Sequence, residues 1–509
     1  MKRLVSVVLF AAAFAGSVNA AEPPRTLRVA FDDRNFGLGN PYATIVTDGV
    51  NTIVLLFDAL TSIGENGALD PALATGWEAI SPTRWRFSLR PGVTFSNGEP
   101  FDAAAVAATI AALKRPEAQG FYMAAEARAV ERVEVVDPLT LDIVTPAPDA
   151  ILPKRMSLIH IVAPKAWAEL GPQKFALSPA GTGPFTVQDW GEKTGRVVMA
   201  ANRASWRAPK ALDRLEMFNA PEQAARTQAL MSGRADFAYN IGFEDLDLVE
   251  AAGFKTVVRP VAFVNALVLQ SRDPASPMHD VRVRRALNYA VDKATIATVI
   301  YRGTTQANGQ GIIPGVTGYN PDIAPYPFDP DKAKRLLAEA GFADGFSVRA
   351  AYWGAGLPEV NAMYAQIAQD FARVGVKVEF NALTRAEWLE LWASGDWTGP
   401  RGGFGMISGT WNGWSYNDAI RAIESYSCRK PGILFCAPEL EPLIDAANAE
   451  FDPAVRERKL QDLLARYHDL APTLYLFAQS HIYAHSPNVA GLSFRHDQVA
   501  FENMELTER

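Results

Sequence analysis

The 509-residue sequence lacks the short motifs that mark common catalytic and metal sites. It has no GxSxG around a serine, no HExxH and no phosphate-binding P-loop. Its six histidines are scattered, and its two cysteines have neither the spacing of a zinc site nor that of a CxxC redox pair. No nucleophile, base or ligand cluster stands out. The sequence therefore predicts a protein that is not an enzyme and that uses no metal and no cofactor.

Basic runs and stripes are also missing. The formal net charge is −7, and no stretch combines clustered Lys and Arg with aromatic residues. Nucleic acids and anionic membranes select basic patches. We therefore expect neither of them as a partner.

Long apolar runs are absent except near the N-terminus. Lys2 and Arg3 precede an apolar run from Leu4 to Gly16, and small residues follow up to Ala20. This is the pattern of a secretory signal peptide, and the run is shorter than the ~20 residues that span a bilayer. No cysteine follows to carry a lipid anchor. We expect a soluble, exported, periplasmic protein that begins near Ala21; an N-terminal anchor or a buried first helix is the alternative.

Cys428 and Cys436 are the only cysteines, and seven residues separate them. In an oxidising compartment, two nearby cysteines form a disulfide. A metal or redox pair is the alternative, although no third or fourth ligand is close in sequence. The expected disulfide closes a short loop, 429–435.

Hydrophobic periodicity and turn residues predict a mixed α/β protein. The segment 347–380 reads as strand, helix and strand, which indicates a largely parallel sheet in the second half. Asp102 precedes a helix that it is expected to cap. The expected elements are strand 26–31, helix 50–60, strand 85–90, helix 103–113, strands 133–136 and 140–144, strands 185–187 and 196–199, helices 281–290, 293–301 and 331–340, strand 347–352, helix 359–374, strand 376–380, helix 453–470 and strand 473–477.

Aromatic residues gather in a Gly-rich stretch, 399–413, and just beyond it. The stretch shows neither a helical nor a strand period, so we expect a loop. Aromatic rings beside amides and hydroxyls suit the binding of an organic ligand; a packed core loop is the alternative. The candidate ligand residues here are Trp411, Asn412, Trp414, Tyr416 and Asp418.

Two other features favour structural roles. His481 and His485 stand four apart, but Ile482-Tyr483-Ala484 between them indicates an extended segment that would hold them about 13 Å apart. The Asp32-Asp33 doublet ends the first strand and fits a turn better than a ligand contact.

Several motifs, in order along the chain, resemble those of the family 5 extracellular solute-binding proteins of ABC importers. This family includes dipeptide, oligopeptide, nickel and opine binders. The matching segments are Ala72-Leu-Ala-Thr-Gly-Trp-Glu78, Trp85-Arg-Phe-Ser-Leu-Arg-Pro-Gly-Val-Thr-Phe-Ser-Asn-Gly-Glu-Pro-Phe-Asp102, Gly181-Thr-Gly-Pro-Phe185, Asp280-Val-Arg-Val-Arg-Arg-Ala-Leu-Asn-Tyr-Ala-Val-Asp-Lys293 and Asp329-Pro-Asp-Lys-Ala-Lys-Arg-Leu-Leu-Ala-Glu-Ala-Gly341. The two cysteines also fall where dipeptide-binding relatives have a disulfide.

The resemblance implies a two-lobed periplasmic-binding-protein fold of type II, similar to cluster C, with an extra subdomain inserted in the first lobe. The lobes would close on the ligand by a hinge motion. The expected boundaries are signal peptide 1–20; lobe I 21–56, 176–264 and 472–509; inserted subdomain 57–175; and lobe II 265–471.

The resemblance also implies a function and further ligand residues. The chain would capture an oligopeptide or peptide-like solute and deliver it, as a monomer, to a membrane permease. Trp353, Asn35 and Phe36 join the candidate ligand residues. A nickel, metallophore, opine or oligosaccharide binder of the same fold is the alternative, and a secreted hydrolase is less favoured.

Two charged anchors of dipeptide-binding relatives are missing from the expected positions. Residues 405–410 contain no Asp for the ligand's ammonium group, and Trp353-Gly354 stands where an Arg would hold its carboxylate. A buried ligand charge without a partner is costly. We therefore expect a larger or less charged ligand than a free dipeptide, unless Asp418 or Asp32 replaces the missing acid.

Overall fold

The computed structural model describes residues 23–31, 39–43, 47–118, 121, 123–191, 194–354, 357–397, 403–429 and 434–507. The predicted signal peptide and the candidate ligand residues Asn35 and Phe36 lie outside these ranges. In the described part, no helix combines the length and apolar character needed to cross a membrane. The predicted boundaries of lobe I, the inserted subdomain and lobe II are kept below as names for the three parts.

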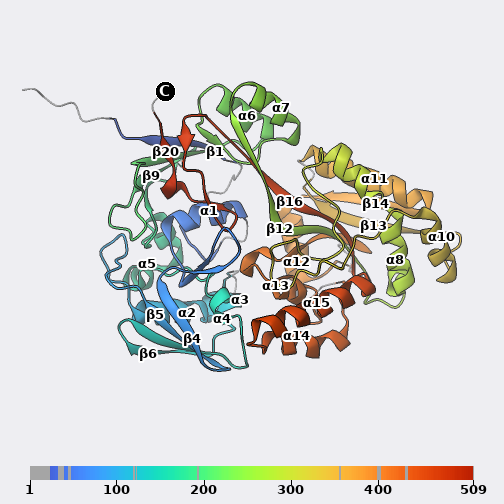
Figure 1. The fold of residues 1–509 in the computed structure, drawn as a ribbon, viewed down its shortest axis with the longest axis horizontal. Coiled ribbons are helices and arrows are strands. Elements are labelled where there is room, and N and C mark those ends of the chain that lie inside the picture. Colours follow the sequence, from blue (N-terminus) through green and yellow to red (C-terminus); the bar gives the residue numbers. More distant parts are fainter. Residues whose placement is uncertain are drawn as a thin grey trace, which may run out of the picture.

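One mixed sheet of ten strands runs through both lobes (Figure 1). The lobe II strands lie at one end and the lobe I strands at the other. Their order is β14 (Val376–Leu383), β13 (Phe346–Trp353), β15 (Met406–Asn412), β12 (Lys255–Leu269), β16 (Thr473–His485), β11 (Phe237–Ala238), β1 (Thr26–Phe31), β10 (Arg214–Asn219), β9 (Arg196–Ala201) and β8 (Phe185–Asp189).

The long strands β12 and β16 join the two lobes. They pair antiparallel from Lys255 opposite His485 to Val268 opposite Thr473, and Figure 1 shows them crossing together from one half of the molecule to the other. The register shifts between Val261 and Ala266, where the ladder is irregular. His481 and His485 lie on β16, as the predicted extended segment requires.

Lobe I and the inserted subdomain share one hydrophobic core, which contains Leu27 of β1 and Phe87 of the subdomain. The subdomain sheet has the order β4 (Ala74–Ser81), β5 (Arg84–Leu89), β7 (Thr140–Val144) and β6 (Arg132–Asp137). Its helix α2 (Ala103–Leu113) begins after Asp102, whose carboxylate accepts the Ala105 N–H at 3.0 Å. The predicted cap is therefore confirmed. The other helices of these two parts are α1 (Thr47–Leu56), α3 (Ala124–Ala127), α4 (Leu152–Arg155), α5 (Pro164–Leu177), α6 (Gln223–Met231) and α7 (Leu246–Ala251).

Lobe II has two separate hydrophobic cores. Helices α8 (Val281–Ala290), α10 (Pro330–Glu339) and α11 (Pro358–Arg373) pack with β13 around one of them. Helices α13 (Ala419–Ser425), α14 (Glu441–Asn448) and α15 (Pro453–Leu470) pack with β15 around the other. The strands β13 and β14 pair directly in parallel, and α11 connects them in the chain. This confirms the predicted strand–helix–strand unit. β12 and β15 are antiparallel, so the sheet is mixed. Lobe II also contains α9 (Lys293–Thr295) and α12 (Arg385–Ser394).

The predicted loop over 399–413 is wrong for its second half, because Met406–Asn412 forms β15 in the middle of the sheet. Met406 to Gly409 are all buried, so this part of the strand has no alternation of polar and apolar residues to recognise. Gly409 is needed because a Cβ atom there would lie 2.9 Å from a methyl carbon of Val268. A glycine that signals flexibility in a sequence here allows close packing.

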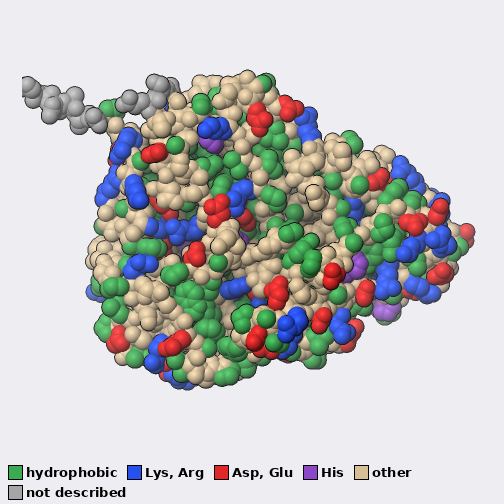
Figure 2. Space-filling model, viewed as in Figure 1, with side chains coloured by type: hydrophobic (Ala, Val, Ile, Leu, Met, Phe, Trp, Pro, Cys, Tyr) green, Lys and Arg blue, Asp and Glu red, His purple; other side chains and the backbone are tan. Residues whose placement is uncertain are grey.

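The surface visible in Figure 2 carries both signs of charge. Lys and Arg side chains alternate with Asp and Glu over both lobes, and neither sign forms a continuous field on this face.

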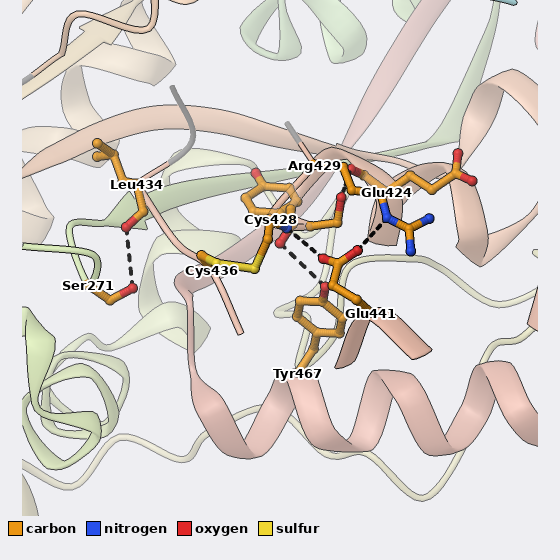
Figure 3. The surroundings of a disulfide bond; sticks show 10 residues. Ser271, Glu424, Cys428, Arg429, Leu434, Cys436, Glu441 and Tyr467 are labelled. Carbon is orange, nitrogen blue, oxygen red and sulfur yellow. Dashed lines mark hydrogen bonds and ion pairs between the residues drawn. A yellow bond between two sulfur atoms is a disulfide. The ribbon is translucent and has the colours of Figure 1, made fainter. Parts of the chain in front are cut away.

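Cys428 and Cys436 form the predicted disulfide (Figure 3). Hydrogen bonds connect the residues beside the disulfide to α14 and to Ser271. The Cys428 N–H donates to the Glu441 side chain of α14 at 2.7 Å, and the Ser271 hydroxyl donates to the Leu434 carbonyl at 3.3 Å. The disulfide and these hydrogen bonds therefore hold Cys428 and Leu434 in place.

Replacing both cysteines by serine should lower the free energy of unfolding by about 2.5 kcal/mol, because the unfolded chain regains the freedom of a short closed loop. Urea unfolding measures the change. A reducing agent should shift the midpoint of the natural protein and leave that of the double variant in place; equal shifts in both would contradict this role.

Candidate functional site

A cavity of about 310 Å³ lies between lobe I and lobe II, beside the connecting strands. Lobe I contributes the start of α6 and residues 240–243. Lobe II contributes Trp353, the first turns of α11, and Ser408 to Thr410 of β15. The connecting strands contribute Asn265 and residues 478–482. The walls therefore come from parts that a hinge motion would move relative to one another.

Amides and hydroxyls supply most of the polar groups in this cavity, which we call the larger cavity. The Gln479 amide donates to the Asn265 side chain at 2.7 Å, and the Thr305 hydroxyl donates to the Ala478 carbonyl at 3.0 Å. Arg226 donates to the backbone carbonyls of Ala220, Pro221 and Asn240. Its guanidinium thus holds backbone, which makes it a poor anchor for a ligand carboxylate.

Glu359 is the only carboxylate among the described residues that line the larger cavity. Burial raises its pKa above the ordinary value, and the nearby carboxylate of Glu244 adds to this, although a hydrogen bond with Gln223 acts in the opposite direction. Gln223 begins α6 of lobe I and Glu359 begins α11 of lobe II. Their contact spans the cleft.

The edge of β15 that faces this cavity is open beyond Ile407. β13 pairs with Met406 and Ile407 alone, whereas β12 pairs with the whole of β15. The Gly413 N–H donates to the Ala262 carbonyl on the β12 side. Because backbone groups alternate along a strand, those of Thr410 and Asn412 point to the other side. Among the described residues, no strand pairs with this edge.

A smaller cavity of about 70 Å³ lies where all three parts of the protein meet. Trp414 enters it from lobe II, His160 from the inserted subdomain, and Asp58 and Arg207 flank it. Asp58 accepts hydrogen bonds from Arg207 at 2.6 Å, from the Thr182 hydroxyl at 2.7 Å and from the Trp206 indole at 2.9 Å.

A network of ion pairs joins the inserted subdomain to lobe II beside this cavity. Asp418 has no exposed surface and accepts Lys154 of the subdomain at 2.9 Å and Arg456 of α15 at 2.7 Å. Burial alone would raise the pKa of Asp418, but the two cations lower it to about 2. Arg155 extends the network to Asp149 at 2.9 Å and to Glu424 of α13 at 3.1 Å. We call these six residues the interlobe network.

The structure places the predicted ligand residues in different environments. Trp353 lines the larger cavity with 40% of its surface exposed, and Trp414 lines the smaller cavity. Their contact with ligand stays a prediction. The Asn412 amide is bonded to Ser415 at 3.1 Å and fixes the turn after β15.

Three predicted ligand residues have other partners. Trp411 has no exposed surface and stacks on Tyr426, with ring centroids 3.9 Å apart. The Tyr416 hydroxyl donates to Glu126 of the subdomain, and Asp418 belongs to the interlobe network. These side chains fill a core and an interface, as the alternative of a packed core describes, and a contact of theirs with ligand stays a prediction.

Sequence reasoning missed Asn265, Gln479, Glu359 and His160. Asn265 and Gln479 lie on parts of β12 and β16 that were not among the expected strands, and Glu359 looks like an ordinary residue of a helix start. Within the described part of the chain, His, Cys, Asp and Glu side chains form no group of three or more that could hold a metal ion.

Asp418→Asn should destabilise the protein by about 3 kcal/mol, because Lys154 and Arg456 would stay buried without a counter-charge. Urea unfolding measures the loss. Asp445→Asn is the matched control, since Asp445 pairs with Arg429 at the surface and a small loss is expected there. Equal losses in the two variants would show that burial of the network contributes nothing.

His160 should make stability depend on pH. Burial lowers the pKa of His160 from 6.5 to about 4, although the charge of Asp58 acts in the opposite direction. The unfolded chain therefore binds the proton first, and this group removes stability as the pH falls from about 6.5 towards 4. Relative to His160→Gln, the natural protein should lose about 2 kcal/mol between pH 7 and pH 5. Urea unfolding at both pH values tests this, and a constant difference would contradict it.

Two lobes joined by paired strands, with a cavity between them, define a protein that encloses a ligand. The chain matches the model of the bacterial extracellular solute-binding proteins, family 5, over residues 68–431. It belongs to this family. Membership makes it a solute-binding protein and not an enzyme, as the sequence predicted, and confirms the periplasmic-binding-protein fold.

Individual relatives are similar over most of their length. The chain is 25% identical over 500 residues to the glutathione-binding protein GsiB of Salmonella paratyphi A, with 93% of each chain covered. It is 27% identical over 453 residues to the dipeptide-binding protein of Escherichia coli, with 80% of each covered. The solved structure of the ABC transporter-associated periplasmic binding protein DppA from Helicobacter pylori, in complex with the peptide STSA, superposes with a TM-score of 0.79, at 21% identity and with 95% and 98% coverage.

Proposed function

We propose that this protein captures an oligopeptide or peptide-like solute in the periplasm and delivers it to the permease of an ABC importer. The open edge of β15 is the observation that carries the proposal. An extended peptide can add to such an edge through its backbone, while cavities beside it receive the side chains. The names of the glutathione- and dipeptide-binding relatives support a ligand of this class.

The larger cavity favours a ligand that places no free carboxylate in it. Arg226 is occupied by backbone carbonyls, and no other Lys or Arg stands among the described residues that line this cavity. The apolar walls at Trp353, Leu357 and Met363 suit a side chain of moderate size. Export by the predicted signal peptide and action as a monomer belong to the same proposal.

Thr410→Pro should abolish ligand binding, because proline removes the N–H that faces the cleft and leaves the β12 side of the strand intact. Thr410→Val is the matched control: it keeps the N–H, removes the hydroxyl and should bind normally. Thermal shift with pools of two- to five-residue peptides measures binding, and circular dichroism checks that both variants fold. A ligand at 100 times its dissociation constant adds about 2.7 kcal/mol of stability.

Two results would contradict this assignment. If no peptide pool stabilises the natural protein, peptide capture is wrong. If folded Thr410→Pro binds as tightly as Thr410→Val, the ligand does not use the strand edge.

A further inference from the structure

The half-buried carboxylate of Glu359 lies on the wall of the larger cavity without a cationic partner. Among the described residues, no ion pair reaches it, and its hydrogen bonds come from its own backbone N–H and from the Gln223 side chain. Charged groups that a protein takes out of water are generally paired. A carboxylate that faces a binding cavity with only neutral partners is therefore suited to a cation from the ligand.

The residues of this cavity that could supply a positive charge have other contacts. Arg226 is 2% exposed and donates to the backbone carbonyls of Ala220, Pro221 and Asn240 in lobe I. The His481 ring is within hydrogen-bond distance of the Tyr483 hydroxyl, at 3.2 Å. Neither of them pairs with Glu359 in the described part of the chain.

A second carboxylate acts on Glu359 from the opposite lobe. Glu244 belongs to the short helix Phe243–Asp245 of lobe I, whereas Glu359 lies in the first turn of α11 in lobe II. Beyond the effect of burial, the charge of Glu244 raises the pKa of Glu359, so the two groups are near enough to repel one another. This repulsion opposes closure of the cleft, and an enclosed cation would remove it.

Aromatic rings form much of the wall around the carboxylate. Phe243 of lobe I meets Tyr301 of lobe II edge to face, with ring centroids 5.6 Å apart, and Tyr364 and Trp353 line the same cavity. Burial raises the pKa of Tyr301, and the charge of Glu359 raises it further, so the phenol lies near the carboxylate. Ring faces attract cations within about 6 Å. Aromatic rings beside a carboxylate suit an ammonium or guanidinium group.

Apolar side chains continue the wall next to Glu359. They are Leu357, Val360 and Met363. Lys and Arg pack their methylene stems along apolar surface while the charged head meets a polar partner, whereas a terminal ammonium group has no such stem. The cavity volume of about 310 Å³ is at the lower end of the range for ligand pockets, about 300–1,000 Å³. It therefore suits one long side chain better than a whole oligopeptide.

We infer that the larger cavity binds a basic side chain of the ligand, Lys or Arg, and that Glu359 is its counter-ion. The inference rests on the proposed function and adds a residue that determines specificity. Thr410, at the open edge of β15, lines the same cavity as Glu359. A peptide along that edge can therefore direct one side chain towards the start of α11.

The test uses two pools of tetrapeptides that differ in one side chain. One pool carries arginine at a fixed position and the other carries citrulline, its uncharged isostere, and the remaining positions hold neutral residues. Each pool is made with a free N-terminus and with an N-acetyl cap. Calorimetry measures apparent dissociation constants for the natural protein, Glu359→Gln and Glu379→Gln. Glu379 is the control, because it is exposed on β14 and does not line the cavity.

The arginine pool should bind about tenfold more tightly than the citrulline pool, with or without the acetyl cap, because hydrogen bonds between charged groups are the stronger ones. Glu359→Gln keeps an oxygen that accepts from Gln223 and loses the charge. It should weaken binding of the arginine pool about tenfold and leave the citrulline pool unchanged. Glu379→Gln should change neither value. Circular dichroism checks folding, and the comparison of the two pools on the natural protein requires no variant.

Three results would overturn the inference and leave peptide capture in place. The first is equal binding of the arginine and citrulline pools to the natural protein. The second is a Glu359→Gln variant that is less stable but keeps the arginine preference, which would limit Glu359 to stabilising the start of α11. The third is a loss of affinity on N-acetylation that Glu359→Gln abolishes, which would assign the carboxylate to the terminal ammonium group.

Failure of the proposed function gives a different result. If neither pool binds in either form, peptide capture is wrong, and n-butylguanidinium then tests the subsite alone. Binding of this cation to the natural protein and not to Glu359→Gln would keep the cation subsite without a peptide. If n-butylguanidinium also fails to bind, the inference falls together with the proposed function.

Discussion

The antiparallel pairing of β12 with β16 is the interaction on which the rest of the molecule depends. These two strands complete the lobe II sheet at one end and the lobe I sheet at the other, so neither lobe has an independent edge there. The irregular ladder between Val261 and Ala266 lies next to Asn265, which lines the larger cavity. Fewer ladder bonds at that point make it the natural place for the pair to bend. A hinge at this point would belong to the same strand as the cavity wall.

The charge balance of the cleft follows from its burial. Arg207 is matched by Asp58 and Glu502, and Asp418 is matched by Lys154 and Arg456. Such pairs contribute modest net stability, but each becomes costly when one partner is removed. The described wall of the cleft therefore offers few unpaired charges to a ligand.

Much of the fold could be predicted from the sequence, because local signals and the tertiary structure agree. The Asp102 cap, the alternation in β5 and the strand–helix–strand unit around α11 all depend on neighbours within a few residues. The family motifs supplied the two-lobed arrangement, which periodicity alone does not contain.

The site was harder to predict, because its residues act through partners far away in the chain. Trp411, Tyr416 and Asp418 carry the composition of a ligand-binding loop. Their real partners are Tyr426, Glu126 and Lys154, and nothing local reveals that Asp418 would meet a cation 264 residues away. Asn265 and Gln479 face a cavity because of the way β12 and β16 pair, so their role appears only after the sheet is assembled.

The interlobe network has a kinetic consequence. Lys154, Arg155 and Asp149 belong to the inserted subdomain, and Asp418, Glu424 and Arg456 belong to lobe II. Separating the parts breaks ion pairs before water can fully replace them, which raises the barrier to opening more than it deepens the closed state. A solute enclosed between the lobes would then leave slowly, and its residence time would be set by lobe separation and not by its own contacts. A permease that receives the solute would then have to supply contacts that pull the inserted subdomain away from lobe II.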